Sequence, residues 1–389
     1  MKGFPPKNET SRRSYLNLPR LWKKPTQRTV LVIGGAGYIG SALLPKLLAR
    51  GHRVRLLDRF FYGSEPVRNL LNHRNLEIIR ADFRRVDKLV ECMEGVDAVI
   101  HLGAIVGDPA CALDHDLTIE VNLMATRTIA EVAKGYGIRR FIFASTCSVY
   151  GASTDDALLT EESSLNPVSL YAITKLASER VLMNLAGENF SPTCLRFSTI
   201  YGLSGRTRFD LVVNLLTAKG IMDGEITIQG GDQWRPFLHV DDAALALLHT
   251  LESPLAQVHQ QVFNVGSDEQ NYTIQQIGEI IKEMVPSAKL LNLGLDGDRR
   301  NYRADFKKIR EQLGFVPRWS VARGIGQVID VIRSGEVKDY RAAKYSNVKF
   351  LTEEENPVSL VRHESSWAYD LVKQTSVISG MTPLVTVAA

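Results

Sequence analysis

Apolar residues in the first half of the chain form short runs that alternate with longer amphipathic stretches. From Thr29 onwards the runs are rich in β-branched residues, and each is apolar throughout instead of alternating with polar positions. This pattern is typical of strands that are buried on both faces of a parallel sheet and joined by crossover helices. The runs expected to form strands are TVLVIG, VRLLD, LEIIRAD, AVIHLGA, RRFIFAS and TCLRFS. The chain is therefore predicted to be an α/β protein with a Rossmann-type, doubly wound parallel sheet.

Beyond about residue 200 the pattern becomes less regular. Short runs such as EITIQ, FLHV and QVFNV lie among helical stretches near 240–252, 273–285 and 321–333, which indicates a smaller C-terminal lobe packed on the sheet. The boundaries that we expect are a basic N-terminal extension at 1–27, the sheet domain at 28–200 (with later segments free to return to it), the lobe at 201–334 and a C-terminal extension at 335–389.

Charge and composition narrow the class of protein. Hydrophobic residues make up 44% and charged residues 23% of the 389 positions, as in ordinary globular proteins. Residues 1–28 hold eight of the 47 basic and one of the 43 acidic side chains, so the remaining chain, with 39 basic and 42 acidic residues, lacks the basic excess of a nucleic-acid binder. No apolar run approaches the roughly 20 residues that span a bilayer, and the four dispersed cysteines predict neither disulfides nor a zinc site. We therefore expect a cytoplasmic protein with no membrane partner.

A glycine-rich turn directly follows the first predicted strand, with Gly34, Gly37 and Gly40 spaced three apart. Such glycines allow a tight turn and let backbone amides approach a pyrophosphate at a helix N-terminus. Asp58 ends the second strand, where a carboxylate binds the adenosine ribose and repels a 2′-phosphate, so NAD is favoured over NADP; Arg59 slightly weakens this preference. Asp82 follows the third strand and fits either an adenine contact or an ordinary turn.

A second group of candidate residues follows the fifth strand, in the segment Ser145–Gly151 and in the next helix. Tyr171 and Lys175 are four residues apart and so share one helix face. An ammonium group near a phenol favours the phenolate, as does a positive nicotinamide ring, so we expect a lowered pKa for Tyr171 and a role as general base for a substrate hydroxyl.

With these motifs in this order, the segment from about Thr29 to about Ile332 resembles the extended short-chain dehydrogenases/reductases, and specifically the NAD-dependent sugar-nucleotide epimerase/dehydratase family. The resemblance implies that Tyr171 is the base, that Lys175 holds the nicotinamide ribose, and that Thr146, or Ser145 one residue earlier, bonds the reacting oxygen. The cofactor residues that it implies, together with those of the glycine-rich turn, are Gly34, Gly37, Tyr38, Ile39, Gly40, Asp58, Asp82, Asn122 and Lys175.

The resemblance also bears on the substrate and the reaction. Family dehydratases and decarboxylases have an acid within the two positions after the Ser/Thr, whereas this chain has Cys147 and Ser148 there, which favours epimerisation or simple oxidoreduction. The lobe at 201–334 is expected to bind a nucleotide-diphosphate sugar through Asn214 and Arg235, where a guanidinium suits a diphosphate. Thr199 stands where many members have Asn. Leu295 replaces a second phosphate-binding Arg of many 4-epimerases, for which the alternatives are Arg299, Arg300 and Arg303.

Three other residues are interpreted as structural. His101 and His239 each border a predicted strand without a second ligand at metal spacing, so we expect no metal site. Cys147 has no adjacent His or Lys and is expected to pack.

The function predicted from these observations is that of an NAD-dependent nucleotide-sugar epimerase, similar to a 4-epimerase. The alternatives left open are a nucleotide ketosugar reductase, a C2 epimerase, and a non-catalytic NAD-bound sensor or scaffold. By analogy with the family, the helices near 112–135 and 168–187 are expected to form a homodimer interface.

Overall fold

The structure, a computed structural model, describes residues 26–152, 158–294 and 300–353. Nearly all of the predicted N-terminal extension, Leu295, Arg299 and the end of the chain from 354 lie outside the described residues. None of the helices in these ranges is both long and apolar enough to cross a membrane.

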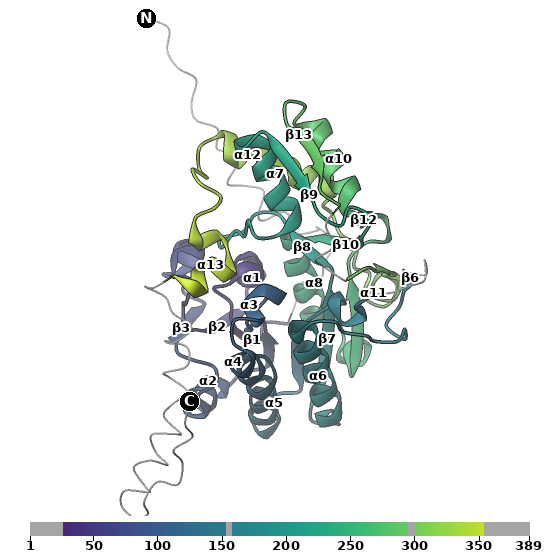
Figure 1. The fold of residues 1–389 in the computed structure, drawn as a ribbon. Helices are drawn as coiled ribbons and strands as arrows, with labels where there is room; N and C mark the ends of the chain where they lie inside the picture. The colour runs from purple at the N-terminus through teal and green to yellow at the C-terminus, as the bar shows by residue number, and fades with distance from the viewer. Residues whose placement is uncertain (1–25, 153–157, 295–299, 354–389) are drawn as a thin grey trace, which may run out of the picture.

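A seven-stranded parallel sheet forms the centre of the molecule (Figure 1), in the order β11-β7-β5-β4-β1-β2-β3. Every run predicted as a strand takes part in it, which confirms the fold class. The strands are β1 (Thr29–Ile33), β2 (Arg53–Asp58), β3 (Leu76–Arg80), β4 (Ala98–His101), β5 (Arg140–Thr146), β7 (Ser191–Phe197) and β11 (Gln261–Val265).

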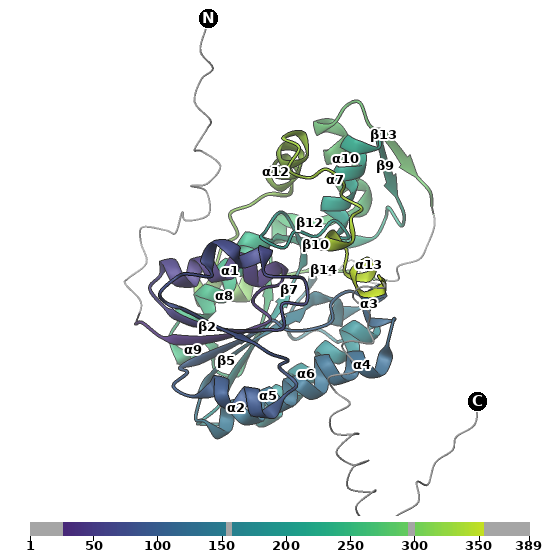
Figure 2. The same ribbon diagram turned by 90° about the vertical axis from the view of Figure 1, so that its left-hand side faces the viewer.

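Helices cover both faces of this sheet, which explains why its strands are apolar throughout. Val30 and Val32 of β1 belong to one core with Leu43 and Leu247, whereas Leu31 faces the opposite core. Figure 2 shows α1 (Tyr38–Ala49) and α8 (Val240–Glu252) over one face and α2 (Val86–Met93), α5 (Ala125–Gly135) and α6 (Leu170–Leu185) under the other.

The helical stretch predicted at 112–135 is divided into α4 (His115–Ile119), a π-helical turn at Glu120–Met124 and α5. Insertions of this kind are rare and often mark functional sites. Asn122, one of the predicted cofactor residues, lies in this turn.

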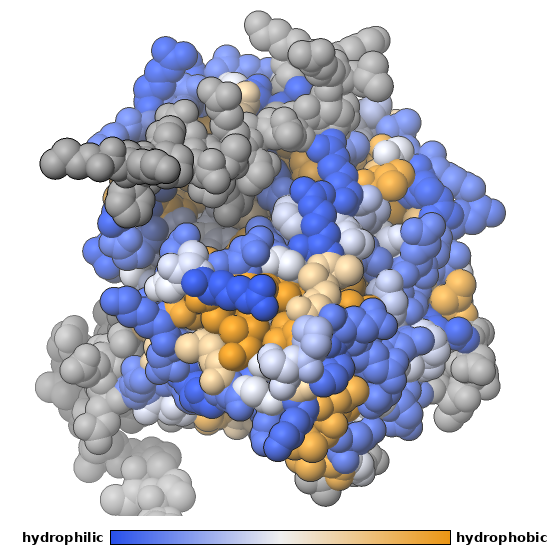
Figure 3. All heavy atoms as spheres, turned by 90° about the horizontal axis from the view of Figure 1, so that it is seen from above, coloured by the Kyte–Doolittle hydropathy of each residue, from blue (hydrophilic) through white to orange (hydrophobic). Residues whose placement is uncertain are grey.

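The smaller lobe lies above the carboxyl ends of the strands in Figure 1. Its core is formed by side chains such as Val213, Ile226, Phe237, Ile277 and Ile325. Seen from above in Figure 3, this side of the molecule is mostly polar, with the largest apolar patch near its middle and smaller apolar patches elsewhere. The elements of the lobe are β8 (Thr199–Tyr201), α7 (Val212–Met222), β9 (Glu225–Ile228), β10 (Trp234–His239), β12 (Asn271–Thr273), α10 (Ile274–Met284), β13 (Lys289–Asn292) and α12 (Val321–Arg333).

Short elements connect the two parts and complete the fold. They are a 3-10 helix at Glu65–Leu70, α3 (Asp108–Cys111), a 3-10 turn at Cys147–Tyr150, β6 (Leu158–Leu159), α9 (Leu255–Val258), a 3-10 turn at Asp268–Gln270, β14 (Arg303–Ala304), α11 (Lys307–Leu313), a 3-10 turn at Ala343–Tyr345 and α13 (Asn347–Thr352).

The chain crosses between the two parts more than once. After β10 it returns to the sheet domain, where α8 packs on α1 and β11 forms an edge strand. The boundary predicted at residue 200 is therefore only approximate, because α8 and β11 come after it and pack in the sheet domain. The segment after 334 packs back on the molecule through Tyr340, whose hydroxyl donates a 2.5 Å hydrogen bond to Asp223.

Candidate active site

A cavity of about 340 Å³ lies at the carboxyl ends of the central strands. Ligand sites of open parallel sheets are expected at this edge. Segments that follow β1, β2, β3, β4, β5 and β7 contribute to its wall, together with α6 and parts of the smaller lobe. The predicted residues that line it are Gly34, Gly37, Tyr38, Ile39, Gly40, Asp58, Asp82, Thr146 and its alternative Ser145, Tyr171, Lys175 and Thr199.

The glycine-rich turn leads directly into α1, and no side chain caps that helix. A Cβ atom at Gly34 would lie 2.6 Å from the backbone of Gly103, and one at Gly40 would lie 2.3 Å from the carbonyl oxygen of Gly35. Both contacts are too close, so these positions require glycine. The backbone N–H groups of the first turn of α1 therefore face the cavity without competition from a capping side chain, which suits an anionic ligand.

The Asp58 carboxylate is held at the end of β2 by backbone amides. Its Oδ2 accepts a hydrogen bond from the Ala36 N–H at 2.9 Å, and its Oδ1 accepts one from the Phe60 N–H at 2.7 Å. Burial raises the pKa of Asp58, although these two hydrogen bonds oppose the rise. Each oxygen retains a lone pair, so the carboxylate can accept hydrogen bonds from a pair of ribose hydroxyls.

Asp82 lines the cavity, but its carboxylate is occupied by arginines. Arg84 donates to it through Nη2 at 2.6 Å and through its backbone N–H at 2.9 Å, and Arg59 Nη1 lies 3.3 Å away. Burial acts to raise the pKa of Asp82, but the hydrogen bonds and charge of Arg84 outweigh it and the pKa is lowered. These contacts favour the turn interpretation of Asp82, and an adenine contact stays a prediction.

Tyr171 and Lys175 lie one turn apart on α6, and both side chains reach the cavity. Lys175 Nζ donates a 2.9 Å hydrogen bond to the carbonyl oxygen of Ala144 and lies 4.6 Å from the centre of the Phe143 ring. Thr146 also lines the cavity, and its hydroxyl acts to lower the pKa of Tyr171. The structure thus brings together the three residues that were predicted to perform the chemistry.

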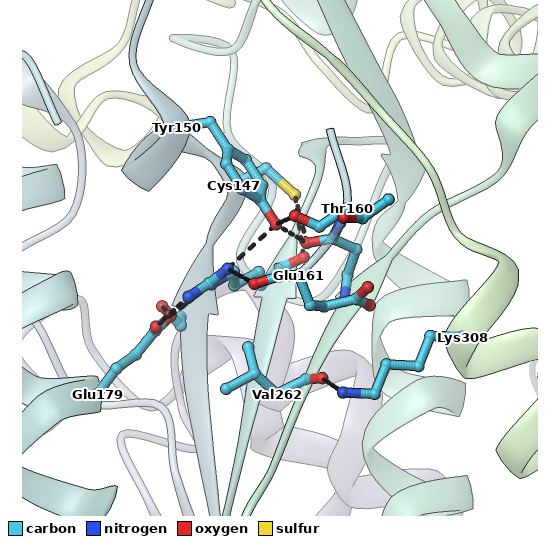
Figure 4. Close-up of polar contacts among 10 residues, drawn as sticks. Cys147, Tyr150, Thr160, Glu161, Glu179, Val262 and Lys308 are labelled. Carbon is cyan, nitrogen blue, oxygen red and sulfur yellow. Dashed lines mark hydrogen bonds and ion pairs between the residues drawn. The ribbon is translucent and has the colours of Figure 1, made fainter. Parts of the chain in front are cut away.

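The hydrogen bonds also separate Thr146 from the alternative Ser145. The Ser145 hydroxyl donates to the buried carboxylate of Glu179, and Arg196 holds the same carboxylate through Nη2 at 2.8 Å. Figure 4 shows Glu179 at one end of this network, with Tyr150 and Cys147 at the other. Both hydroxyls donate hydrogen bonds, Ser145 to the charged Glu179 carboxylate and Thr146 to the neutral Ser148 hydroxyl at 3.1 Å. Because a hydrogen bond to a neutral acceptor is the weaker of the two, the geometry favours Thr146 as the donor to a reacting oxygen.

The pKa values of the pair differ from the expectation. Burial raises the pKa of Tyr171 above its ordinary value, with Cys111 and Asp108 adding to the rise and Arg208 and Thr146 opposing it. Burial also lowers the pKa of Lys175 to about 8. In the protein without its cofactor, desolvation therefore outweighs the groups that lower the pKa of the phenol. The lowering expected from Lys175 together with the nicotinamide ring stays a prediction.

Cys147 is fully buried and its Sγ lies 3.1 Å from the carbonyl oxygen of Arg196. Burial raises the pKa of this thiol, which stays protonated at neutral pH. Ser148 does reach the cavity, and its Oγ accepts a 3.1 Å hydrogen bond from the Thr146 hydroxyl. The packing role predicted for Cys147 is confirmed, and the two positions after Thr146 supply no carboxylate.

The two histidines interpreted as structural are buried. His101 is fully buried and its Nε2 lies 3.0 Å from the Thr126 hydroxyl, while burial lowers its pKa to about 3. His239 caps α8 by accepting a 3.1 Å hydrogen bond from the Asp241 N–H, and its ring stacks on Trp319 at 3.9 Å. In the described ranges no three His, Cys, Asp or Glu side chains gather as metal ligands would.

Three predicted residues do not line the cavity. The amide of Asn122 exchanges hydrogen bonds of 2.8 and 3.0 Å with the backbone of Ile105, a residue of the cavity wall, and so supports that wall from behind. Asn214 is fully buried and bonds the backbone of Gly202 and Arg208. Arg235 donates to the carbonyl oxygens of Trp234 and Arg300. Direct ligand contacts by these side chains therefore stay predictions.

Arg300, one of the alternatives named for Leu295, does line the cavity and pairs with Asp108 at 3.4 Å. Arg303 instead lies over the Trp234 ring at 5.0 Å. Arg235 donates a hydrogen bond to the carbonyl oxygen of Arg300. This contact helps to fix the segment that carries the Arg300 guanidinium.

Several residues of the cavity wall were not identified as candidate site residues from the sequence. They include Arg206 and Arg208 in the loop after β8, and Asn347 and Leu351 of α13. The basic pair could have been found from its position after a strand end, where ligand-binding side chains gather. Asn347 could not, because no motif marks the helix that carries it.

Asn347 joins three parts of the molecule. Its backbone N–H donates to Asp210 at 2.9 Å, and its Nδ2 donates to the carbonyl oxygen of Val106 at 2.8 Å. The predicted C-terminal extension therefore contributes to the cavity wall.

Comparison with known proteins identifies the family of the chain. The model of the NAD dependent epimerase/dehydratase family matches residues 30–266. A Bacillus subtilis protein described as an uncharacterized UDP-glucose epimerase, YtcB, is 30% identical, with 78% of this chain and 98% of the relative covered. The UDP-N-acetyl-alpha-D-glucosaminuronate decarboxylase of Bacillus cytotoxicus is 28% identical over 80% of this chain and 99% of its own length.

Among solved structures, the UDP-glucuronic acid 4-epimerase of Bacillus cereus, in complex with UDP-glucuronic acid and NAD, superposes with a TM-score of 0.70. It is 27% identical, with 79% of this chain and 99% of that structure covered. The chain belongs to the NAD-dependent epimerase/dehydratase family, whose members are enzymes of the extended short-chain dehydrogenase/reductase fold.

The residues present fit NAD as the cofactor. The glycine-rich turn offers backbone N–H groups to a diphosphate, Asp58 offers two acceptors to a ribose, and Lys175 lies near Tyr171 to bond a second ribose. When bound, NAD supplies the hydride acceptor and the positive charge of its nicotinamide ring.

We expect Asp58→Ala to narrow the preference for NAD over NADP. The change removes both a negative charge near the site of a 2′-phosphate and the acceptor for the ribose hydroxyls, so NAD affinity should fall while NADP affinity rises or holds. Dissociation constants for the two cofactors would show this, with the exposed Asp87→Ala as control. A wild type that binds both cofactors equally would contradict the prediction and assign the dominant effect to Arg59.

Lys175→Met should stabilise the cofactor-free protein at pH 7 while removing activity. The pKa of Lys175 is about 8 in the folded protein, against the ordinary 10.5. Below pH 8, where Lys175 is protonated in both the folded and the unfolded chain, its buried charge therefore lowers the free energy of unfolding by about 3 kcal/mol. This cost falls as the pH rises from 8 to 10.5, so the gain should shrink over that range. Urea unfolding at pH 7 and pH 10, with the exposed Lys338→Met as control, tests this; equal stability of mutant and wild type at pH 7 would contradict it.

Proposed function

We propose that the protein is an NAD-dependent nucleotide-sugar epimerase that inverts a hydroxyl-bearing carbon of the sugar, in the manner of a 4-epimerase. The observation that carries the proposal is the group of Tyr171, Thr146 and Lys175 at the cavity, with Cys147 and Ser148 where an acid would serve dehydration. The likeness to a UDP-glucose epimerase and to the UDP-glucuronic acid 4-epimerase supports it.

In this mechanism each side chain has one task. Tyr171 takes the proton of the reacting hydroxyl, Thr146 donates a hydrogen bond to the same oxygen, and Lys175 orients the nicotinamide ribose. The hydride leaves the sugar carbon and later returns to its opposite face, so the reaction is redox-neutral. Tyr171 must therefore also return the proton, which needs a pKa close to the working pH.

The substrate in this proposal is a nucleotide-diphosphate sugar. Arg300 faces the cavity beside Asp108, which accepts a 2.7 Å hydrogen bond from Ser169 at the start of α6. A guanidinium at the catalytic end of the cavity suits the diphosphate of such a substrate.

Tyr171→Phe should reduce turnover by roughly a hundred- to ten-thousand-fold, the range typical of general-base loss, while NAD stays bound. Candidate UDP-, GDP-, CDP- and dTDP-sugars would be incubated with enzyme and only trace NAD, and epimers resolved by NMR. The exposed Tyr136→Phe serves as control. Stoichiometric consumption of NADH with a ketosugar, and no interconversion of epimers, would reject the epimerase in favour of a reductase.

We further propose a homodimer that pairs the region of α4 and α5 with α6, and a cytoplasmic location. Apolar side chains that are 37–51% exposed occur on these helices and close to them; they are Ile119, Met124, Val168 and Ile173. The four cysteines are buried free thiols, as suits a reducing compartment.

Ile173→Glu is expected to halve the mass of the particle in light scattering at micromolar protein, because it places a charge in the apolar interface. Val86→Glu changes an equally exposed apolar residue of α2 and should leave the mass unchanged. A monomeric wild type would contradict the proposed dimer.

A further inference from the structure

Arg206 has a buried guanidinium group that lacks partners for most of its donors. The residue is 5% exposed and lines the cavity. Its Nε and Nη2 atoms are buried and have no hydrogen-bond partner within the described chain. Because burying an unpaired cation costs several kcal/mol, a guanidinium in this state indicates an anionic ligand.

Its charged neighbours do not satisfy this requirement. Asp210 is the nearby carboxylate that attracts Arg206, but it is already bonded by Arg208 Nε at 2.9 Å and Nη2 at 3.0 Å, and by the Asn347 N–H. Arg208 repels Arg206, and the phenols of Tyr62 and Tyr38 are neutral because burial raises the pKa of each. The pKa of Arg206 is lowered to about 10 by burial, so the group stays charged at neutral pH.

The loop that carries Arg206 is seated against the glycine-rich turn. The Arg206 N–H donates to the Ser41 hydroxyl at 3.2 Å, and Ser41 directly follows Gly40 in α1. A Cβ atom at the preceding Gly205 would lie 2.1 Å from the carbonyl oxygen of Pro66. The guanidinium is therefore at the cofactor end of the cavity, whereas Arg300 is beside Asp108 at the catalytic end.

Aromatic rings hold the guanidinium in place. Arg206 Cζ lies 3.7 Å from the centre of the Tyr62 ring, and Tyr62 comes four residues after Asp58. The ring of Phe350, in α13, lies 4.8 Å from the Tyr62 ring. A planar stack of this kind fixes the direction of the unpartnered N–H groups.

We propose that Arg206 is a cofactor-binding residue that pairs with the diphosphate of bound NAD, opposite the backbone N–H groups at the start of α1. The diphosphate would then be held between a helix N-terminus and a guanidinium that come from different lobes. The proposal rests on NAD binding and is independent of which reaction the enzyme performs.

The test measures binding and not turnover. For Arg206→Gln we expect the dissociation constants of NAD and of ADP to rise about 10- to 100-fold, as for loss of a charge-assisted hydrogen-bonded pair, while that of UDP changes less than twofold. Arg206→Lys keeps the charge but loses the planar fork, so its dissociation constants for NAD and ADP should lie between those of the wild type and those of Arg206→Gln. Isothermal titration of protein freed of cofactor gives these values, and the NAD that each variant retains on purification gives a second measure.

A control and a stability measurement distinguish ligand binding from a structural role. Arg323, whose guanidinium stacks on Trp319 at 3.9 Å outside the cavity, provides the matched variant Arg323→Gln, which should bind NAD normally. Without cofactor, Arg206→Gln should melt at the same temperature as wild type or higher, because it removes an unpaired buried charge.

Three results would overturn the proposal. In the first, Arg206→Gln leaves NAD and ADP affinity unchanged. In the second, it weakens the binding of UDP instead, which would make Arg206 a substrate-binding residue. In the third, it weakens the binding of all three ligands and also lowers the melting temperature, which would mean that the stack of Arg206 on Tyr62 has a purely structural role. A wild type that binds no NAD would contradict the cofactor assignment itself and not this inference alone.

Discussion

The position of α6, the helix that carries Tyr171 and Lys175, depends on the buried ion pair between its Glu179 and Arg196 of β7. Each residue is 3% exposed, and Arg196 donates to the carboxylate through Nε at 3.1 and 3.2 Å and through Nη2 at 2.8 Å. Desolvating two charges is costly unless all their hydrogen bonds are made. Here the hydroxyl of Ser145 donates a further hydrogen bond to the Glu179 carboxylate. Because Glu179 is one turn after Lys175, the pair sets the register of Tyr171 and Lys175 over the end of β5.

The same network extends from the sheet to the far wall of the cavity. Arg196 Nη1 donates to the Tyr150 hydroxyl at 3.1 Å, which in turn donates to Asn264 Oδ1 at 2.7 Å. The Asn264 amide donates to the carbonyl oxygens of Leu159 and Asp305, both at 3.2 Å. Asp305 follows the segment that carries Arg300 and Tyr302. A polar network in which each member is satisfied thus ties residues far apart in sequence to one arrangement.

The sequence was sufficient where local pattern determines position. Apolar runs predicted six of the seven strands of the central sheet, whereas QVFNV, which forms β11, was assigned to the lobe. The spacing of Tyr171 and Lys175 placed both on one helix face. The directions of single side chains could not be predicted, because they depend on contacts between distant segments. Asn214 has the residue type expected for a phosphate ligand, but the backbone at Gly202 and Arg208 uses its amide. Arg206 carried no motif, and its unpartnered state arises only when its loop packs on Ser41.

Charge in the cavity connects cofactor binding to the stability of the fold. Lys175 and Arg206 are both at least 95% buried, and neither forms an ion pair in the described ranges. Each lowers the stability of the protein alone, since burial disfavours the charged form. A ligand that binds only the folded state stabilises it by an amount that grows with the logarithm of its concentration over its dissociation constant. In the proposed complex the diphosphate of NAD compensates the charge of Arg206, whereas the ribose hydroxyls give Lys175 hydrogen-bond acceptors without a counter-charge.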